Sequence, residues 1–201
     1  MVRIFNIFFS GLALVVLAPL LVIIIFVLKL TGEGEVFFLQ ERIGKDREIF
    51  KLFKFATMLR GSPSKGAGTV TIKNDPRVLP VGKFLRRTKI NELPQLLNVF
   101  IGHMSLIGPR PQVPRCFDAF TVEAQNIIVQ VKPGLSGIGS IVFRGEEDIL
   151  EGYSGTLNFY DEVIGPYKGD IEAWYVARQG LVAYFVLILL TIWVVLFPKS
   201  D

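Results

Sequence analysis

The chain has 201 residues, 51% of them hydrophobic, and its formal net charge is +4. Its single cysteine, Cys116, and single histidine, His103, exclude an internal disulfide and leave no spacing for a metal site built from Cys and His. A Walker loop, a dinucleotide fingerprint and a Ser/His/Asp set are also missing from the sequence.

An apolar block near the N-terminus predicts a membrane helix. Ile4–Leu28 is interrupted only by Asn6, Ser10, Gly11 and Pro19, and about 20 apolar residues suffice to cross a bilayer. A signal peptide fits poorly, because the run is too long and no small-residue cleavage site follows it. Pro19 has no backbone N–H to donate, so we expect the helix to kink there.

This kink leaves two topologies open. The helix either crosses the bilayer as a kinked span, the commoner outcome for a lone proline, or dips into one leaflet and returns as a re-entrant hairpin. Arg3 and Lys29 stand at the two ends of the block and are compatible with both ends staying in the cytosol.

The middle of the chain predicts a predominantly helical α+β domain. Glu35–Gln40 and Glu48–Phe55 are rich in Phe and Val and flank Gly44, which indicates a small β-hairpin. Asn91 is typical of an N-cap, followed by a helix over Glu92–Ile101. We expect amphipathic helices of this domain to lie at the membrane interface.

Two segments rich in glycine and proline follow. Gly108–Pro111 predicts a rigid, non-helical turn around Arg110. Further along, Gly134, Gly137 and Gly139 predict a loop in which two backbones approach closely.

Basic residues are concentrated directly after the first apolar block. Between Glu41 and Lys89, only Glu41, Asp46, Glu48 and Asp75 oppose a much larger number of Lys and Arg. This asymmetry favours anionic headgroups or phosphorylated substrates as partners. The alternative is the positive-inside rule alone, which needs basic residues beside a membrane but no substrate.

A second apolar block, Leu181–Phe197, lies at the C-terminal end. As a helix it would be about 26 Å long, close to the roughly 30 Å hydrocarbon core of a bilayer. It either spans the membrane or forms a buried or interfacial helix. The predicted organisation is therefore an N-terminal membrane helix at residues 1–30, a cytosolic domain at 31–178 and a C-terminal apolar helix at 179–201.

Several spaced motifs resemble the bacterial sugar transferases known as monotopic phosphoglycosyl transferases. The similar segments, in chain order, are VFFLQERIGKDREIFKLFKFATM, TIKNDPRVLPVGKFLRRTKINELPQLLNVFIGHMSLIGPRP and VKPGLSGIGSI. The resemblance implies transfer of a sugar-1-phosphate from a UDP-sugar to polyprenyl phosphate, with release of UMP and with magnesium (Mg²⁺) as cofactor. It also implies a re-entrant helix bent at a Ser-Pro pair, which here is Ala18-Pro19.

The implied catalytic pair departs from the family pattern. The family has Asp-Glu ahead of Leu-Pro-Gln, and this chain has Asn91-Glu92. A carboxamide is a very poor nucleophile, so covalent catalysis does not carry over to Asn91. Three explanations remain open: Glu92 acts as nucleophile, or as Mg²⁺ ligand and base; the domain binds substrate without turnover; or the chain is an engineered Asp-to-Asn variant.

Four basic residues are candidate phosphate ligands. The resemblance assigns Lys54 and Arg86 to phosphate binding, Arg87 lies beside Arg86, and Arg110 in its proline-bounded turn is suited to a bidentate grip. The structural alternatives are a solvated turn for Arg110 and attraction to the membrane surface for the Arg86-Arg87 pair.

The metal ligands would be acidic side chains. Glu92 is the first candidate and Asp161 the second, although Asp161 is also typical of an ordinary surface residue. Two further departures, Ala56 and His103, stand where the resemblance places a basic and an acidic residue.

The leading hypothesis is a transferase that starts a surface glycan on the cytosolic face of the bacterial inner membrane. Its partners would be a UDP-sugar, polyprenyl phosphate and an anionic bilayer, with no nucleic acid, and a homodimer is left open. The rivals are a non-catalytic binding or scaffold protein of the same fold and a lipid-interacting transporter accessory, which leaves the Asn-Glu-Leu-Pro-Gln and Gly-Pro-Arg-Pro segments unexplained.

Overall fold

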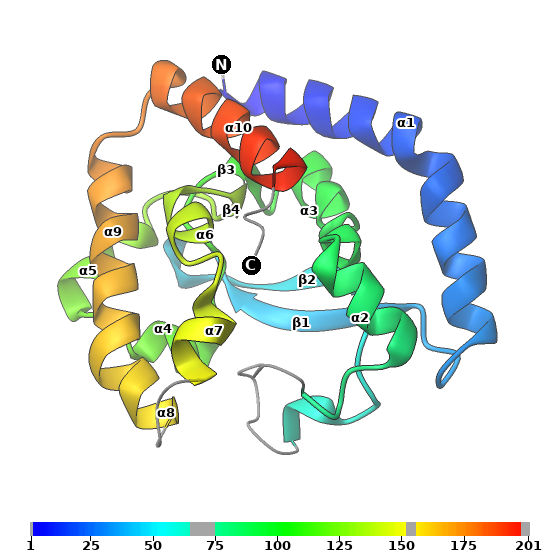
Figure 1. The fold of residues 1–201 in the computed structure, drawn as a ribbon. Coiled ribbons are helices and arrows are strands. Elements are labelled where there is room, and N and C mark those ends of the chain that lie inside the picture. Colours follow the sequence, from blue (N-terminus) through cyan, green and yellow to red (C-terminus); the bar gives the residue numbers. More distant parts are fainter. Residues whose placement is uncertain (1, 65–74, 152–155, 198–201) are drawn as a thin grey trace.

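The computed structural model describes residues 2–64, 75–151 and 156–197. Within them, helices outnumber strands, and a single antiparallel hairpin supplies the longest strands, which confirms a predominantly helical α+β fold (Figure 1). Part of the second similar segment, residues 71–74, lies outside the described residues.

The N-terminal apolar block forms one long helix, α1 (Val2–Leu30), with Pro19 inside it. By length and composition α1 is able to cross a membrane. Figure 1 shows that it bends part-way, so that its two halves run along different sides of the molecule. The interior proline explains the bend, because its ring crowds the preceding turn and it donates no hydrogen bond.

Both halves of α1 pack on the same domain. In the first half, the Asn6 side chain is 3% exposed; its Oδ1 accepts the Leu106 N–H at 3.1 Å and the Tyr184 hydroxyl at 2.8 Å. In the second half, Ile24 and Leu28 are buried among apolar side chains of the hairpin and the next helix. The Asn6 Nδ2 atom also donates to Ser105 Oγ at 3.0 Å, so the buried amide is hydrogen-bonded on both sides and holds the first half of α1 against the domain.

The predicted hairpin is confirmed. Strands β1 (Phe37–Ile43) and β2 (Ile49–Phe55) are antiparallel, with Arg42 opposite Phe50 and Lys54 opposite Phe38. Because side chains alternate along a strand, Arg42 and Lys54 lie on the same face of the hairpin.

A helical segment follows the hairpin and carries the Asn91-Glu92 pair. Asn91 lies inside a short 3-10 turn, η3 (Ile90–Glu92), and the helix after it, α3 (Gln95–Ile101), begins at Pro94 without a side-chain cap. The predicted N-cap role of Asn91 is therefore wrong. Lys89, in the left-handed region (φ 59°), is the N-cap of this turn instead, and Asn91 lies two positions after it.

The glycine-rich segments form a parallel two-stranded ladder, β3 (Ser105–Ile107) with β4 (Gly134–Ser136). The predicted close approach is confirmed: a Cβ on Gly134 would lie 2.1 Å from the Gly108 nitrogen, and one on Gly137 would lie 2.1 Å from the Gly108 oxygen. The strands themselves were not expected, because three-residue strands leave too short a pattern to detect.

The remaining elements cover this ladder and the hairpin. They are η1 (Lys45–Arg47), η2 (Ser62–Ser64), α2 (Pro80–Arg87), α4 (Pro114–Asp118), α5 (Val122–Ile128), α6 (Ile138–Val142), α7 (Glu146–Glu151), α8 (Thr156–Phe159), η4 (Tyr160–Ile164), α9 (Gly165–Ala177) and α10 (Leu181–Leu196). The second apolar block is thus helical, and Figure 1 shows α10 beside the first half of α1.

We expect Gly134→Ala to destabilise the fold strongly, because the new methyl group would meet backbone atoms that cannot move aside. Its cost should reach about 3 kcal/mol or more. Gly180→Ala is the matched control, since nothing lies within 4 Å of a Cβ at that extended position. Thermal unfolding of both variants in the same detergent checks this, and equal melting temperatures would contradict the close approach.

Candidate active site

Glu92 and Arg110 meet although they come from different elements. Glu92 ends η3, and Arg110 lies in the non-helical turn after β3, as predicted. The Arg110 Nη2 atom is 3.4 Å from Glu92 Oε1, in a partly buried position.

The turn around Arg110 is held from two sides. The Arg110 backbone N–H donates to Glu172 Oε1 at 2.9 Å, and Glu172 is fully buried. On the other side, Arg42 Nη1 donates to the Pro111 carbonyl at 2.8 Å. The guanidinium of Arg110 is therefore presented from a backbone fixed by neighbouring side chains.

A small pocket opens between the hairpin, α3 and this turn, and we call it the basic pocket. Its lining consists of Arg42, Leu52, Lys54, Gln95, Arg110, Pro111 and Leu135. The Nε atom of Arg42 is buried there without a hydrogen-bond partner. Such an unsatisfied cationic donor is costly unless a ligand accepts from it.

Helix α3 fixes the strand that carries Lys54. The Asn98 side chain, which is fully buried, accepts the Phe53 N–H at 2.9 Å and donates to the Lys51 carbonyl at 2.8 Å. These two bonds attach β2 to the helix that follows the Asn91-Glu92 pair. Asn98 therefore connects the strand that carries Lys54 to the helix that follows Glu92.

The clustered charges shift each other's pKa values. Burial, together with Arg42, lowers the pKa of Lys54 to about 7. Burial acts to raise the pKa of Glu92, but Arg110 and Lys54 outweigh it and hold that pKa at about 2. Burial and then Arg110 lower the pKa of Arg42 to about 10. Burial and the neighbouring charges thus act together on each of these groups.

Comparison with known proteins assigns the chain to a family. The model of the family described as "Bacterial sugar transferase" matches residues 1–198. The chain belongs to the bacterial sugar transferase family.

Several relatives carry names that describe their activity. The exopolysaccharide production protein PSS of Rhizobium leguminosarum bv. phaseoli is 47% identical over 108 residues, which are 54% of each chain. A UDP-glucose:undecaprenyl-phosphate glucose-1-phosphate transferase of Klebsiella pneumoniae is 40% identical over 152 residues, 74% of this chain and 32% of that protein.

A third relative is closer in size. The putative undecaprenyl-phosphate N-acetylgalactosaminyl 1-phosphate transferase of Bacillus subtilis (strain 168) is 40% identical over 126 residues, 63% of this chain and 68% of that protein. The chain thus spans about half the length of the Rhizobium relative and about a third of the Klebsiella one.

In this member of the sugar transferase family, Asn91 is buried and its Oδ1 atom has no hydrogen-bond partner. The side chain is 7% exposed, so a carboxylate of the same shape would also fit this space. An unpartnered oxygen at the position where the resemblance places a nucleophile is a candidate ligand for a cation.

The oxygen atoms present fit a magnesium ion only with help from substrate. Among the described residues, no group of three or more His, Cys, Asp or Glu side chains gathers around one point. Mg²⁺ is commonly held by one or two carboxylates together with substrate phosphates and water. The Glu92 carboxylate and the orphaned Asn91 oxygen match that minimal set.

The other predicted site residues lie in different settings. Arg86 on α2 is half-buried and close enough to Lys54 to lower its pKa, whereas Arg87 is exposed. Asp161 on η4 is paired with Arg115, at 2.8 Å between Oδ2 and Nη2. The structure therefore brings Glu92, Lys54, Arg86 and Arg110 into one electrostatic cluster, and it engages Asp161 with another partner.

Sequence reasoning missed Arg42, Gln95 and Glu172. Arg42 lies in the first segment that resembles the family, which was the available signal for it. Glu172 gave no signal beyond membership of an acidic stretch. Burial raises the pKa of Glu172 to about 7, although the hydrogen bond from the Arg110 N–H and the charge of Lys168 act to lower it.

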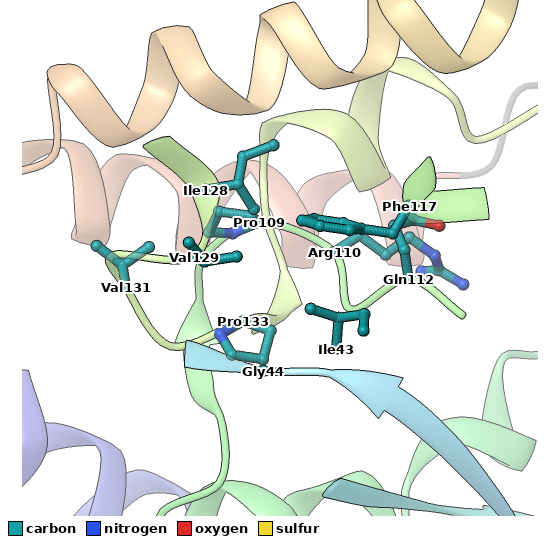
Figure 2. Close-up of a pocket in the computed structure, with 10 residues that line it drawn as sticks. All are labelled: Ile43, Gly44, Pro109, Arg110, Gln112, Phe117, Ile128, Val129, Val131 and Pro133. Atoms are coloured by element: carbon teal, nitrogen blue, oxygen red, sulfur yellow. The ribbon is translucent and has the colours of Figure 1, made fainter. Parts of the chain in front are cut away.

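A second pocket lies on the other side of the Arg110 turn. Figure 2 shows its ten lining residues, of which Arg110 is the only charged one. Pro109, Val129 and Val131 make it mostly apolar. Arg110, which lines both pockets, is therefore the one lining residue here whose side chain carries a charge that a phosphate could pair with.

The Glu92 carboxylate should make stability depend on pH. Its pKa in the folded protein, about 2, lies below the ordinary value of 4.5 for this side chain, so its contribution to stability is present above pH 4.5 and is lost as the pH falls toward 2. We expect Glu92→Gln to cost about 3 kcal/mol near pH 6, and we expect the gap to fall to less than half at pH 3. Melting curves recorded at several pH values measure the difference in stability between parent and variant. Glu123→Gln, at the exposed start of α5, is the control. A difference that does not change with pH would contradict the ion pair.

Proposed function

We propose that the chain transfers a sugar-1-phosphate from a UDP-sugar to polyprenyl phosphate and releases UMP, as the first membrane step of a bacterial surface glycan. The observation that carries the proposal is the basic pocket, which Arg42, Lys54 and Arg110 line, together with the ionised Glu92 that pairs with Arg110 at 3.4 Å. The names of the Klebsiella and Bacillus relatives support the substrate classes.

Each part of the pocket has a role in this reaction. The three cations offset the charge of the diphosphate and of the departing UMP. An oxygen of the lipid phosphate forms a bond to the sugar-proximal phosphorus, and the bond from that phosphorus to the UMP oxygen breaks. We propose that Mg²⁺, held by Glu92 and the Asn91 oxygen with the phosphates, supplies further charge neutralisation.

The low pKa of Glu92 supports two of the roles left open for it, cation ligand and nucleophile. A carboxylate with a pKa of about 2 stays ionised at neutral pH, so it is a poor proton acceptor. It remains suited to binding a cation or attacking phosphorus as a nucleophile. Since a lipid phosphate is already anionic at neutral pH, direct transfer needs no general base, and we propose that Glu92 acts as ligand or nucleophile.

The second candidate is a binding protein of the same fold that does not turn over its ligand. It is favoured by one observation, the carboxamide of Asn91 in the place of the implied nucleophile. Such a protein would bind the UDP-sugar in the same pocket and hold it for a partner.

We further propose the re-entrant topology for α1, with the domain on the cytosolic face of the inner membrane. Both ends of the helix are attached to one domain: Arg3 Nη1 donates to the Val99 carbonyl at 2.6 Å near the start, and Leu28 is buried near the end. A helix that crossed the bilayer would have to separate these two ends by about 30 Å of hydrocarbon. The division at residues 30 and 178, the interfacial helices and a homodimer stay predictions.

Purified protein with Mg²⁺, UDP-glucose or UDP-N-acetylgalactosamine and undecaprenyl phosphate should release UMP. Glu92→Gln should lower the rate by about a hundredfold or more, because it removes the anion that binds or attacks. Asn91→Asp should keep or raise the rate. If the parent protein releases no UMP and Asn91→Asp does, the result would support the binding-protein candidate. If neither protein releases UMP with any of the UDP-sugars, the transferase proposal would be rejected.

Affinity for the UDP-sugar should fall as the pH rises through about 7. The Lys54 side chain is positively charged below its pKa of about 7 and loses this charge above it. We expect the diphosphate to bind the charged form. We expect up to about a tenfold loss per pH unit. Lys54→Arg should flatten the profile because its guanidinium stays charged. Titration calorimetry with UDP-glucose measures it, with Lys83→Arg on exposed α2 as control; a flat parent profile would contradict the role of Lys54.

A further inference from the structure

A fully buried acid, Glu172, lies behind the turn that presents Arg110. Helix α9 carries this residue, and its Oε1 atom accepts the Arg110 backbone N–H at 2.9 Å. Within the described part of the chain, its Oε2 atom has no hydrogen-bond partner. The proposed transfer uses neither oxygen of this side chain, so a buried carboxylate at this place needs a reason of its own.

Glu172 also contacts a second segment, the first turn of α6. The Gly139 N–H, like that of Arg110, forms a hydrogen bond that acts to lower the pKa of Glu172. A Cβ on Gly139 would lie 2.2 Å from Glu172 Oε1, so a glycine is what leaves room for the carboxylate here. One side chain therefore joins three segments that are distant in sequence: the Arg110 turn, the start of α6 and the middle of α9.

Stability does not explain a carboxylate at this position. Lys168, one turn earlier on α9, and Arg110 act to lower the pKa of Glu172, yet burial outweighs them and raises it to about 7. Replacing a buried ion by an apolar side chain of similar volume is often neutral or stabilising. Residues that cost stability are commonly kept because activity depends on them.

The hydrogen bond to Arg110 does not require Glu172 to be charged. The unpartnered Oε2 atom is available for a proton while Oε1 still accepts the Arg110 N–H. Glu172 thus supplies an acceptor oxygen at a fixed point. The Arg110 side chain extends from this backbone to 3.4 Å from Glu92, so a shift of the backbone would move the guanidinium. A misplacement of about 1 Å can cost on the order of a hundredfold in rate.

We infer that Glu172 is a positioning residue for the transfer: by holding the Arg110 turn to the start of α6, it places the Arg110 guanidinium against the transferring phosphate. Glu172 does not line the basic pocket, so it acts through Arg110 and not on the substrate. The inference rests on the proposed function and adds a residue outside the pocket on which the rate depends.

Two variants separate the hydrogen bond from the fold. Glu172→Met keeps an unbranched side chain of similar length and removes the carboxylate acceptor, whereas Glu172→Gln keeps an acceptor oxygen. With UDP-glucose or UDP-N-acetylgalactosamine and undecaprenyl phosphate, Glu172→Met should lower kcat for UMP release by about tenfold or more, with the Kd for the UDP-sugar within about threefold and little change in melting temperature. Glu172→Gln should keep kcat within about threefold.

Asp170→Leu is the matched control, because it replaces an exposed acid on the same helix and should leave kcat unchanged. Equal kcat in the parent and in Glu172→Met would overturn the inference. A Glu172→Gln protein as slow as Glu172→Met would also overturn it, because the charge and not the acceptor would then matter. If Glu172→Met does not fold, Glu172→Leu takes its place, and Glu172→Gln still has to keep its rate.

An altered Arg110 tests the route through this residue. Lysine carries its charge on a flexible stem and depends less on an exact placement, so Glu172→Met should cost less than about threefold in an Arg110→Lys protein. An equal loss in both backgrounds would overturn the route through Arg110.

Hydrogen exchange of the Arg110 amide gives a readout that needs no turnover. This amide should exchange about tenfold faster or more in Glu172→Met and at the parental rate in Glu172→Gln, because only the methionine removes its acceptor. Unchanged exchange in Glu172→Met would reject the role of Glu172 whether or not the protein turns over. A parent that releases no UMP, with exchange that responds as expected, would reject the transferase instead.

Discussion

The site depends on one arginine, Arg110, whose backbone is held by one carboxylate and whose side chain pairs with another. Glu172, fully buried, accepts the Arg110 backbone N–H at 2.9 Å, and Glu92 faces the Arg110 side chain at 3.4 Å. The turn that presents this arginine fits against β4 only because Gly134 and Gly137 have no side chain to meet its backbone. Glu172 therefore fixes the backbone from which the Arg110 side chain extends toward Glu92.

Three cations lie close together in this cluster. Burial, together with repulsion between neighbouring cations, lowers the pKa values of Arg42 and Lys54. Glu92 offsets part of this repulsion, and a diphosphate would offset more of it. Perturbed pKa values cluster at functional sites, which agrees with the membership in a family of transferases.

The same few contacts join the site to the apolar helices. Asn98 on α3 fixes the strand that carries Lys54, and Arg3 at the start of α1 donates to carbonyls at the end of α3. Only one helix therefore separates the basic pocket from the apolar surface of α1. A substrate with a charged phosphate and a long hydrocarbon chain needs both surfaces within reach of each other.

Periodicity and composition alone determined the two apolar helices, the hairpin, the Pro19 bend and the close approach of Gly134 to Gly108, because each depends on local preference or on the bare size of a residue. The motifs also named Glu92, Lys54 and Arg110. What the sequence left undecided was the role of Asn91 in its turn, the short β3–β4 ladder, and the part played by Arg42 and Glu172. Those depend on which distant segments meet: Glu172 reaches Arg110 across 62 positions of the chain, and pKa values of about 2 and about 7 at Glu92 and Lys54 arise only when burial and neighbouring charges act together.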